Sequence, residues 1–204
     1  MAYRGLNMVR VALKDADTKE LVTGIDGLSE TGIYEVTDKV WGSKTANITG
    51  MNPNEQQVFG NNKLQTTLVS GFVQPQVALE FNNLPIMIQQ RLVGRVPDGN
   101  GGYKKDTEHD YIVALQVELL AANNIDKAYF CFPEGIIEDG AGVNGATEAG
   151  TPALIEDQLT YKAQAADSID GDTYRLFSSA EADFNEAKMN ELTFGVKKPE
   201  DPKP

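Results

Sequence analysis

The segment Asp98–Tyr103, which reads DGNGGY, has the residue types of a calcium-binding loop. In an EF-hand loop, calcium needs an oxygen ligand at the fifth position, glycine at the sixth for a sharp turn, and glutamate at the twelfth. Counted from Asp98, those positions hold Gly102, Tyr103 and His109. The spacing therefore excludes such a loop, and we predict no metal site in the chain.

The glycines of the same segment could instead cradle a phosphate group. A phosphate-binding loop of the P-loop type reads G-x-x-x-x-G-K-[ST] and lies between a strand and a helix. The chain lacks that motif, and the segment follows a predicted helix rather than a strand. Because Asp, Asn and Gly adopt left-handed turn conformations readily, we interpret residues 97–102 as a turn.

Residues for catalysis are scarce. Cys131 and His109 are the single cysteine and the single histidine of the chain. These counts argue against most metalloenzymes and against Cys–His or Ser–His catalysis. We expect Cys131 to be a small core residue in an apolar strand and His109 to be exposed at the start of a strand.

Neighbouring acids would suit a hydrolase only if two of them converged in a cleft. Such pairs are expected by chance among 30 acidic residues, and we interpret them as solvated. They are Glu138/Asp139, Glu156/Asp157 and Glu181/Asp183. We therefore predict no catalytic residue, no cofactor and no enzymatic activity, and a hydrolase that uses paired acids remains a rival interpretation.

The 204 residues carry a formal net charge of −12. Affinity for nucleic-acid backbones and for anionic membranes rests on clustered Lys and Arg, which the sequence lacks. Charged residues interrupt the N-terminal apolar stretch, and no run of residues has the length of a membrane span. We expect one domain over residues 1–196, a disordered tail over 197–204, no membrane partner, and synthesis in a cytoplasm.

Alternating apolar residues dominate the pattern, which is typical of strands packed on one side. The stretch 111–120 has a fully apolar face and a mixed face. The apolar face holds Tyr111, Val113, Leu115, Val117 and Leu119, and the mixed face holds Ile112, Ala114, Gln116, Glu118 and Leu120. Further strands are predicted at 6–14, 32–38, 63–70, 72–81, 127–134, 154–165 and 172–177. This mainly β pattern favours an antiparallel sandwich or barrel.

Two helices interrupt the strands. The first begins after Asn82 or Asn83 and stops at Gly94, a residue suited to a left-handed C-cap. Its predicted core stripe is Leu84, Met87, Ile88 and Leu92. The second runs from Ser179 as N-cap to Thr193, with Phe184, Ala187 and Leu192 facing inward. The stretches 41–62 and 135–152 show no clear regular structure and have the length of functional loops. Trp41, at the start of the first stretch, suits either an interface or a core position.

Taken in order, these parts resemble the major tail protein, or tail tube protein, of siphophage bacteriophages. From Phe81 to Gly135 the chain shows a strand, the helix LPIMIQQRLVG, a charged turn with glycine, DYIVAL opening a strand and AYFCFPEG opening the next. Tail tube proteins show a similar succession. The segments TGIDGL at 23–28 and DQLT at 157–160 also fit the pattern, whereas the Gly/Ala-rich segment 138–151 departs from it.

The resemblance implies a two-sheet antiparallel β-sandwich, the tail-tube fold, with a short flanking helix on its outer side and a second helix near the C-terminus. It implies a structural virion protein whose hexameric rings stack into a hollow tube for phage DNA passage into the host. The implied partners are further copies of the chain, the tape measure protein, other tail proteins and, transiently, double-stranded DNA. The implied location is the virion tail.

The resemblance also suggests which residues would mediate assembly. The segment 41–63 would be the loop that reaches the next ring, with Trp41, Lys44, Asn47, Asn54, Gln57, Phe59 and Lys63 as its contact residues. Polar strand faces would line the lumen or the subunit interface, through Gln74, Gln76, Glu80, Gln116 and Glu118. The alternative is another β-rich virion or surface module, such as a capsid decoration protein or a carbohydrate-binding adhesin domain.

Overall fold

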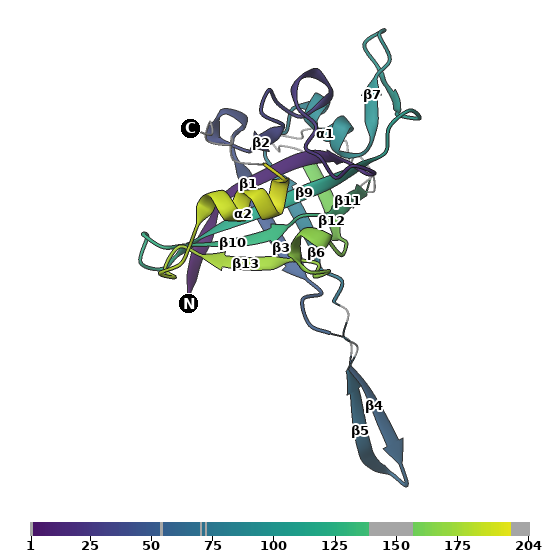
Figure 1. Ribbon diagram of the computed structural model, residues 1–204, viewed down its shortest axis with the longest axis vertical. Coiled ribbons are helices and arrows are strands. Elements are labelled where there is room, and N and C mark those ends of the chain that lie inside the picture. The colour runs from purple at the N-terminus through teal and green to yellow at the C-terminus, as the bar shows by residue number, and fades with distance from the viewer. Residues whose placement is uncertain (1, 54, 70, 72, 139–156, 197–204) are drawn as a thin grey trace, which may run out of the picture.

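The protein is described by a computed structural model that covers residues 2–53, 55–69, 71, 73–138 and 157–196. These residues are mainly antiparallel β-structure with two α-helices, and they form two packed sheets from which a long hairpin projects (Figure 1). The predicted fold class, a mainly β sandwich, is confirmed. The predicted tail at 197–204 and most of the Gly/Ala-rich segment lie outside the described residues.

One sheet, called sheet A, has five strands in the order β13-β10-β9-β1-β2. Their bounds are Arg175–Ser178 for β13, Lys127–Phe132 for β10, Tyr111–Ala121 for β9, Tyr3–Asp15 for β1 and Ile33–Glu35 for β2. Every neighbouring pair is antiparallel. The long β1–β9 pairing runs through the middle of this sheet and carries two register shifts.

The other sheet, called sheet B, has four strands in the order β11-β12-β6-β3. Their bounds are Gly135–Glu138 for β11, Asp157–Ala163 for β12, Gln76–Phe81 for β6 and Ser43–Thr49 for β3. All of its pairings are antiparallel. Each predicted strand overlaps an observed one, whereas β3 and β11 lie in stretches predicted to be irregular.

The core lies between the two sheets, as the alternation of apolar residues predicts. Its buried members include Val9, Val11, Leu13, Val113, Leu115, Val117 and Phe132 from sheet A, and Val77, Leu79, Phe81, Leu159 and Tyr161 from sheet B. The buried Tyr161 hydroxyl donates to the carbonyl oxygens of Val113 at 3.2 Å and Phe132 at 3.4 Å, so its polar group is satisfied. A side chain at Gly135 would collide with the Tyr161 ring, which explains why glycine opens β11.

Helix α1 spans Ile86–Leu92 and closes one end of this core. The prediction places it on an outer side of the sandwich instead. Its N-cap is Pro85, so the predicted caps Asn82 and Asn83 are wrong. Just before the helix, the Leu84 N–H donates to the Asp157 carboxylate at 2.8 Å. Gly94 has φ 74°, which confirms the left-handed residue after the helix.

The predicted core stripe of α1 is only partly correct. Leu84, Ile88 and Leu92 are buried in the main core, as expected. Met87 is 44% exposed, so its placement in the core is wrong. The helix presents one side to the core, which buries Ile88, Arg91 and Leu92 and leaves Ile86 and Met87 exposed.

Helix α2 spans Glu186–Phe194 and begins later than predicted. Its N-cap is Asn185, whose side chain accepts from the backbone N–H of Lys188 at 3.0 Å, and not Ser179. Met189, Thr193 and Phe194 face inward. The predicted inward residue Ala187 is exposed.

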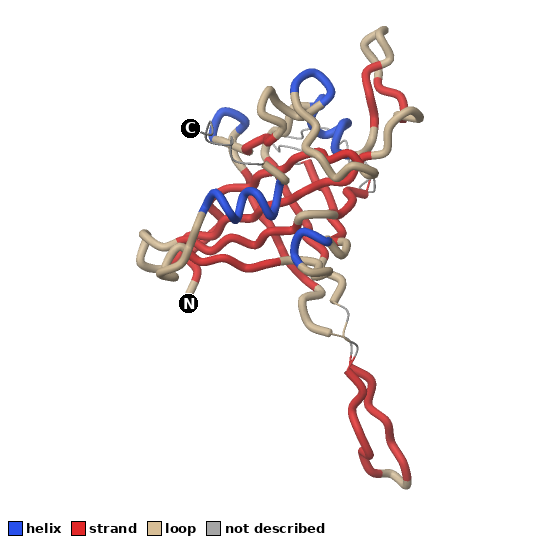
Figure 2. The backbone as a smooth tube through the Cα atoms, in the orientation of Figure 1, coloured by secondary structure: helices blue, strands red, loops and turns tan. Residues whose placement is uncertain are grey.

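Two hairpins project from the sandwich (Figure 2). The longer joins β4, Glu55–Gly60, to β5, Lys63–Val69, through Asn61 and Asn62, both with positive φ. The prediction of an irregular 41–62 segment is therefore wrong. The shorter hairpin joins β7, Arg95–Pro97, to β8, Tyr103–Lys105.

The DGNGG segment forms the tip of the shorter hairpin, which confirms the predicted turn. The Asp98 carboxylate accepts from the backbone N–H groups of Asn100 at 2.8 Å and Gly102 at 2.9 Å. These hydrogen bonds favour the ionised form and lower the pKa of Asp98. Among the described residues, no helix is long and apolar enough to cross a membrane.

The buried Ile88 and the exposed Met87 of the α1 stripe should respond very differently to substitution by aspartate. Ile88→Asp places a carboxylate in the dry core and should lower the free energy of unfolding by about 4 kcal/mol, enough to prevent folding of a marginal domain. Met87→Asp should cost less than about 1 kcal/mol, because that side chain is exposed. Urea unfolding of both variants measures the difference, and equal losses of stability would refute the assignment of Met87 to the surface.

Candidate assembly surfaces

The outer face of sheet A is covered by α2 (Figure 1). Phe194 packs against Ala12 and Ala114, and Met189 packs against Tyr129 and Cys131. Ahead of the helix, the Phe184 ring stacks on Tyr129 with ring centroids 5.6 Å apart. This apolar cover keeps much of the outer face of sheet A from water.

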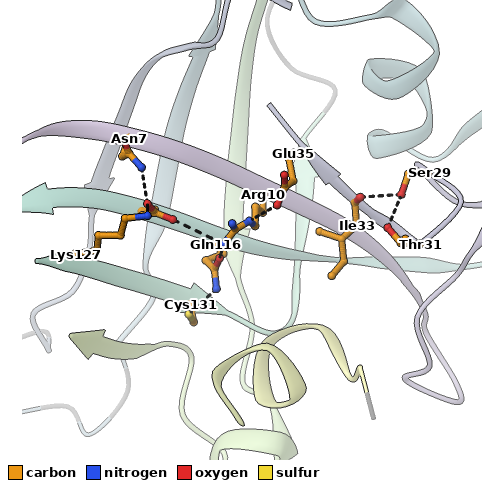
Figure 3. A network of polar contacts seen from close by, with 10 residues as sticks. Asn7, Arg10, Ser29, Thr31, Ile33, Glu35, Gln116, Lys127 and Cys131 are labelled. Atoms are coloured by element: carbon orange, nitrogen blue, oxygen red, sulfur yellow. Dashed lines mark hydrogen bonds and ion pairs between the residues drawn. The ribbon is translucent and has the colours of Figure 1, made fainter. Parts of the chain in front are cut away.

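A polar network occupies the part of the same face that lies beside the helix (Figure 3). The buried Glu118 carboxylate lies 2.7 Å from the Lys127 ammonium and 3.7 Å from the Arg10 guanidinium, and it accepts from the Asn7 amide. Its hydrogen bond to Lys127 raises the pKa of that amine. Lys127 and Arg10 thus compensate the buried charge of Glu118, and Arg10 is shared with a second carboxylate, Glu35, at 2.7 Å.

Gln116 and Glu118 are therefore part of the subunit's interior, with exposed fractions of 0% and 2%. Gln116 accepts from Arg10 at 2.8 Å and donates to the Cys131 sulfur at 3.5 Å. Neither side chain is available to a lumen or to a neighbouring subunit in this conformation, contrary to the prediction. The strand pattern could not reveal this, because the polar side chains around Glu118 and the helix beside them come from other parts of the chain.

Cys131 is buried in β10, as predicted, and burial raises the pKa of its thiol to about 11. Because the thiolate is the reactive form, such a thiol is chemically inert near neutral pH. His109 is exposed, as predicted, and stacks on Tyr111, with its Nδ1 at 3.4 Å from the Asp106 carboxylate. Among the described residues, no three His, Cys, Asp or Glu side chains gather in a way that would hold a metal ion.

The outer face of sheet B, in contrast, is open and polar. The strand register places three rows of side chains across it: Thr45, Glu80 and Gln158; Asn47, Ala78, Thr160 and Glu138; Thr49, Gln76, Lys162 and Ile136. Most of these side chains are exposed, and no described helix packs over them. In the described part of the chain, β3 and β11 are the two edge strands of this sheet.

Polar contacts order this open face. The Glu80 carboxylate accepts from the Thr45 hydroxyl at 3.0 Å and from the Gln158 amide at 3.4 Å. Lys162 pairs with Glu138 at 2.6 Å. The three rows thus carry two carboxylates and one ammonium group among hydroxyl and amide side chains, Ala78 and Ile136. Of the residues predicted to line a lumen, Gln76 and Glu80 lie on this face, and the exposed Gln74 lies just before β6.

The β4–β5 hairpin is the other candidate surface. Its strands pair only with each other among the described elements, and nearly all of its residues are exposed. Exposed apolar side chains lie on both faces, because Phe59 pairs with Leu64 across the bulge, whereas Val58 shares a face with Leu68. An isolated two-stranded hairpin is marginally stable in water, so this one is suited to being covered by a partner.

The structure separates the residues predicted for ring stacking. Gln57, Phe59 and Lys63 lie on the β4–β5 hairpin, whereas Asn47 lies on the open face of sheet B, Lys44 is exposed in β3, and Asn54 is outside the described residues. Trp41 is 60% exposed with φ 61°, which favours the interface interpretation over the core interpretation. Sequence reasoning missed Val58, Leu64 and Leu68 as exposed apolar residues. Their exposure follows from the hairpin pairing, which the sequence pattern does not indicate.

Comparison with known proteins bears on both surfaces. A family model described as phage tail tube protein matches residues 1–201 of the chain. No curated protein matches it. Proteins of the matched family are structural components of the virion tail that assemble with themselves and with other tail proteins into a tube.

Burial of Cys131 predicts a slow thiol reaction. In the folded protein at pH 8, the thiolate fraction should be about 100-fold lower than in the unfolded chain, so a disulfide reagent such as DTNB should react at least that much more slowly. The folded thiol keeps its proton at pH values above 9.0, the ordinary pKa of a cysteine thiol. Its contribution to stability is therefore complete below pH 9 and falls as the pH rises towards about 11.

Stopped-flow labelling with and without denaturant measures this ratio. Equal labelling rates in the native and denatured states would contradict the buried position of Cys131. The chain is also suitable for engineered cross-linking, because its single native thiol, Cys131, is unreactive near neutral pH.

Proposed function

Because the chain belongs to the phage tail tube protein family, we propose that it is the major tail tube subunit of a siphophage bacteriophage. Six copies form a ring, the rings stack into a hollow tube, and phage DNA passes through the tube into the host. The role is structural and needs no catalysis. The protein is made in the cytoplasm of the host bacterium and ends in the virion tail, where the tape measure protein is a further partner.

The single observation that carries this proposal is the unequal cover of the two sheets. Helix α2 and the Glu118 network occupy the outer face of sheet A, whereas sheet B leaves a polar face open. We infer that the open face of sheet B lines the lumen and that α2 lies on the outside of the tube. A polar lining of this kind is compatible with a water-filled interior.

Ring closure follows from the edges of sheet B. Edge strands expose backbone N–H and C=O groups that pair readily with another strand. If β3 of one subunit pairs with β11 of the next, six copies of the sheet form one continuous barrel around the lumen. Such pairing satisfies both edges at once and needs no change in the sandwich.

The charge of the chain suits the passage of DNA. A duplex carries a dense row of phosphates, and proteins hold it mainly through Lys and Arg. The proposed lining has two carboxylates and one ammonium group, and the whole chain has a net charge of −12. A wall of this composition repels the phosphates weakly and allows the duplex to slide.

The β4–β5 hairpin supplies the contact between rings. It projects away from the sandwich, and its two strands pair only with each other among the described elements (Figure 2). Its exposed apolar residues would lose contact with water when a neighbouring ring covers them. Stacking would therefore stabilise both the hairpin and the tube.

Electron microscopy of the concentrated protein tests the proposal. The unmodified chain, alone or with its tail partners, should form hollow tubes or six-fold rings. A variant in which a short Gly-Ser linker replaces residues 55–69 should keep the β-rich circular dichroism spectrum but form no tubes, because the sandwich does not depend on the hairpin. A persistent monomer of the unmodified chain, with and without partners, would contradict the proposal.

The lumen assignment makes a separate prediction about infection. The variant Gln158→Lys/Thr160→Lys places cations on the open face of sheet B and should still form tubes, but the phage titre should fall by at least about tenfold as DNA adheres to the wall. Ala187→Lys, on the exposed side of α2, is the matched control and should leave the titre unchanged. Plaque assays on phage carrying each variant give the result. Equal titres would place the sheet B face away from the DNA path.

A further inference from the structure

Two segments joined by a hydrogen bond, the 3-10 turn Gly24–Asp26 and helix α1, carry exposed apolar residues. Ile25, in the 3-10 turn Gly24–Asp26, is 88% exposed, and Ile86, in the first turn of α1, is 63% exposed. Met87 next to it is also exposed. We call Ile25, Ile86 and Met87 the apical patch.

The two segments of the apical patch are held together. The Arg91 guanidinium, on α1, donates to the carbonyl oxygen of Asp26, which ties the 3-10 turn to the helix. Arg91 is itself buried, so this contact belongs to the fixed body of the protein. The exposed side chains therefore stand on an ordered base, and the fold itself gives no reason for their exposure.

Figure 1 shows the β4–β5 hairpin at one end of the long axis and helix α1 on the opposite side of the sandwich, beside the β7–β8 hairpin that forms the other end. In a tube built by stacking identical units, each contact between successive units is head-to-tail, so the lower end of one copy must fit the upper end of another. Apolar side chains are exposed on the hairpin and on the apical patch. Phe59 and Leu64, which pair near the hairpin tip, match the apical patch in chemical type.

The charges beside the two surfaces are also complementary. Lys63 precedes Leu64 at the hairpin tip, and Asp26 follows Ile25 at the apical patch; both side chains are exposed. Opposite charges at the rim of an interface steer association and fix its register. A flexible methionine such as Met87 adapts to the shape of an inserted aromatic ring.

We propose that the tip of the β4–β5 hairpin of one copy docks on the apical patch of a second copy in the adjacent ring. Phe59 and Leu64 cover Ile25, Ile86 and Met87, and Lys63 lies beside Asp26 of the second copy. This docking rests on the proposed tube and names the surface that receives the hairpin. It also accounts for the exposure of Met87 and Ile86 on a helix that buries Ile88, Arg91 and Leu92.

Substitution of the patch tests the docking. Ile86→Asp/Met87→Asp should fold, because both side chains are exposed, and should raise the protein concentration needed for tube formation by at least about tenfold, the loss expected for central interface residues. Ile125→Asp, at an exposed apolar position in the β9–β10 turn, is the matched control and should leave that concentration unchanged. Thermal melting confirms that each variant is folded.

Charge exchange and cross-linking give measurements that a folding defect cannot mimic. Asp26→Lys should weaken assembly, and Asp26→Lys/Lys63→Glu should restore it. Phe59→Cys/Ile86→Cys, on oxidation of assembled tubes, should give a ladder of covalent multimers, while either single variant should give at most dimers.

The outcomes separate this docking from the proposed function. Tubes of the unmodified chain together with normal assembly of Ile86→Asp/Met87→Asp, or the absence of a ladder from cross-linked tubes, would overturn the docking and leave the tube intact. A failure of the unmodified chain to form tubes under any condition would overturn the proposed function, and the docking with it.

Discussion

The packing of α2 against sheet A decides which surfaces of the subunit can meet water. Phe194 and Met189 cover one end of that face, and the ion pairs of Glu118 satisfy the polar residues beside them. Removal of the helix would expose apolar side chains and a buried carboxylate together, a costly combination. With this face closed, the open face of sheet B becomes the polar surface on which the proposed lumen depends. The two sheets share one core, so a single fold produces one covered sheet face and one open sheet face.

The second constraint is the exposure of features that a monomer does not need. The edges of sheet B, the β4–β5 hairpin and the apical patch each present groups that water accommodates poorly. In the proposed tube each of them is satisfied by a further copy: edge with edge within a ring, and hairpin with patch between rings. The acidic character of the chain opposes this association through repulsion between like charges. Assembly must therefore rest on short-range pairing and apolar contact.

The sequence predicts the sheets well and the exposed features poorly, for physical reasons. Alternation at Tyr111–Leu120 reveals a strand because one side of it packs on a core. The β4–β5 hairpin faces no core within its own subunit, and its first strand, β4, lies in a stretch interpreted as irregular, whereas its second strand, β5, is predicted as a strand. The prediction places Gln116 and Glu118 at the lumen or the subunit interface, although both are buried. Strand periodicity carries no information on what other parts of the chain cover a strand. Met87 fits the helical stripe, but the buried side of this two-turn helix holds Ile88, Arg91 and Leu92 and leaves Met87 exposed.

The central claim is that sheet B faces the lumen while α2 faces outward. A reconstruction of assembled tubes by electron cryomicroscopy measures this arrangement directly. The account predicts a continuous barrel made of β11, β12, β6 and β3 from successive subunits, with Gln76 and Thr160 directed at the channel and α2 on the tube surface. Density for α2 on the channel wall, or the open face of sheet B buried between rings, would contradict it.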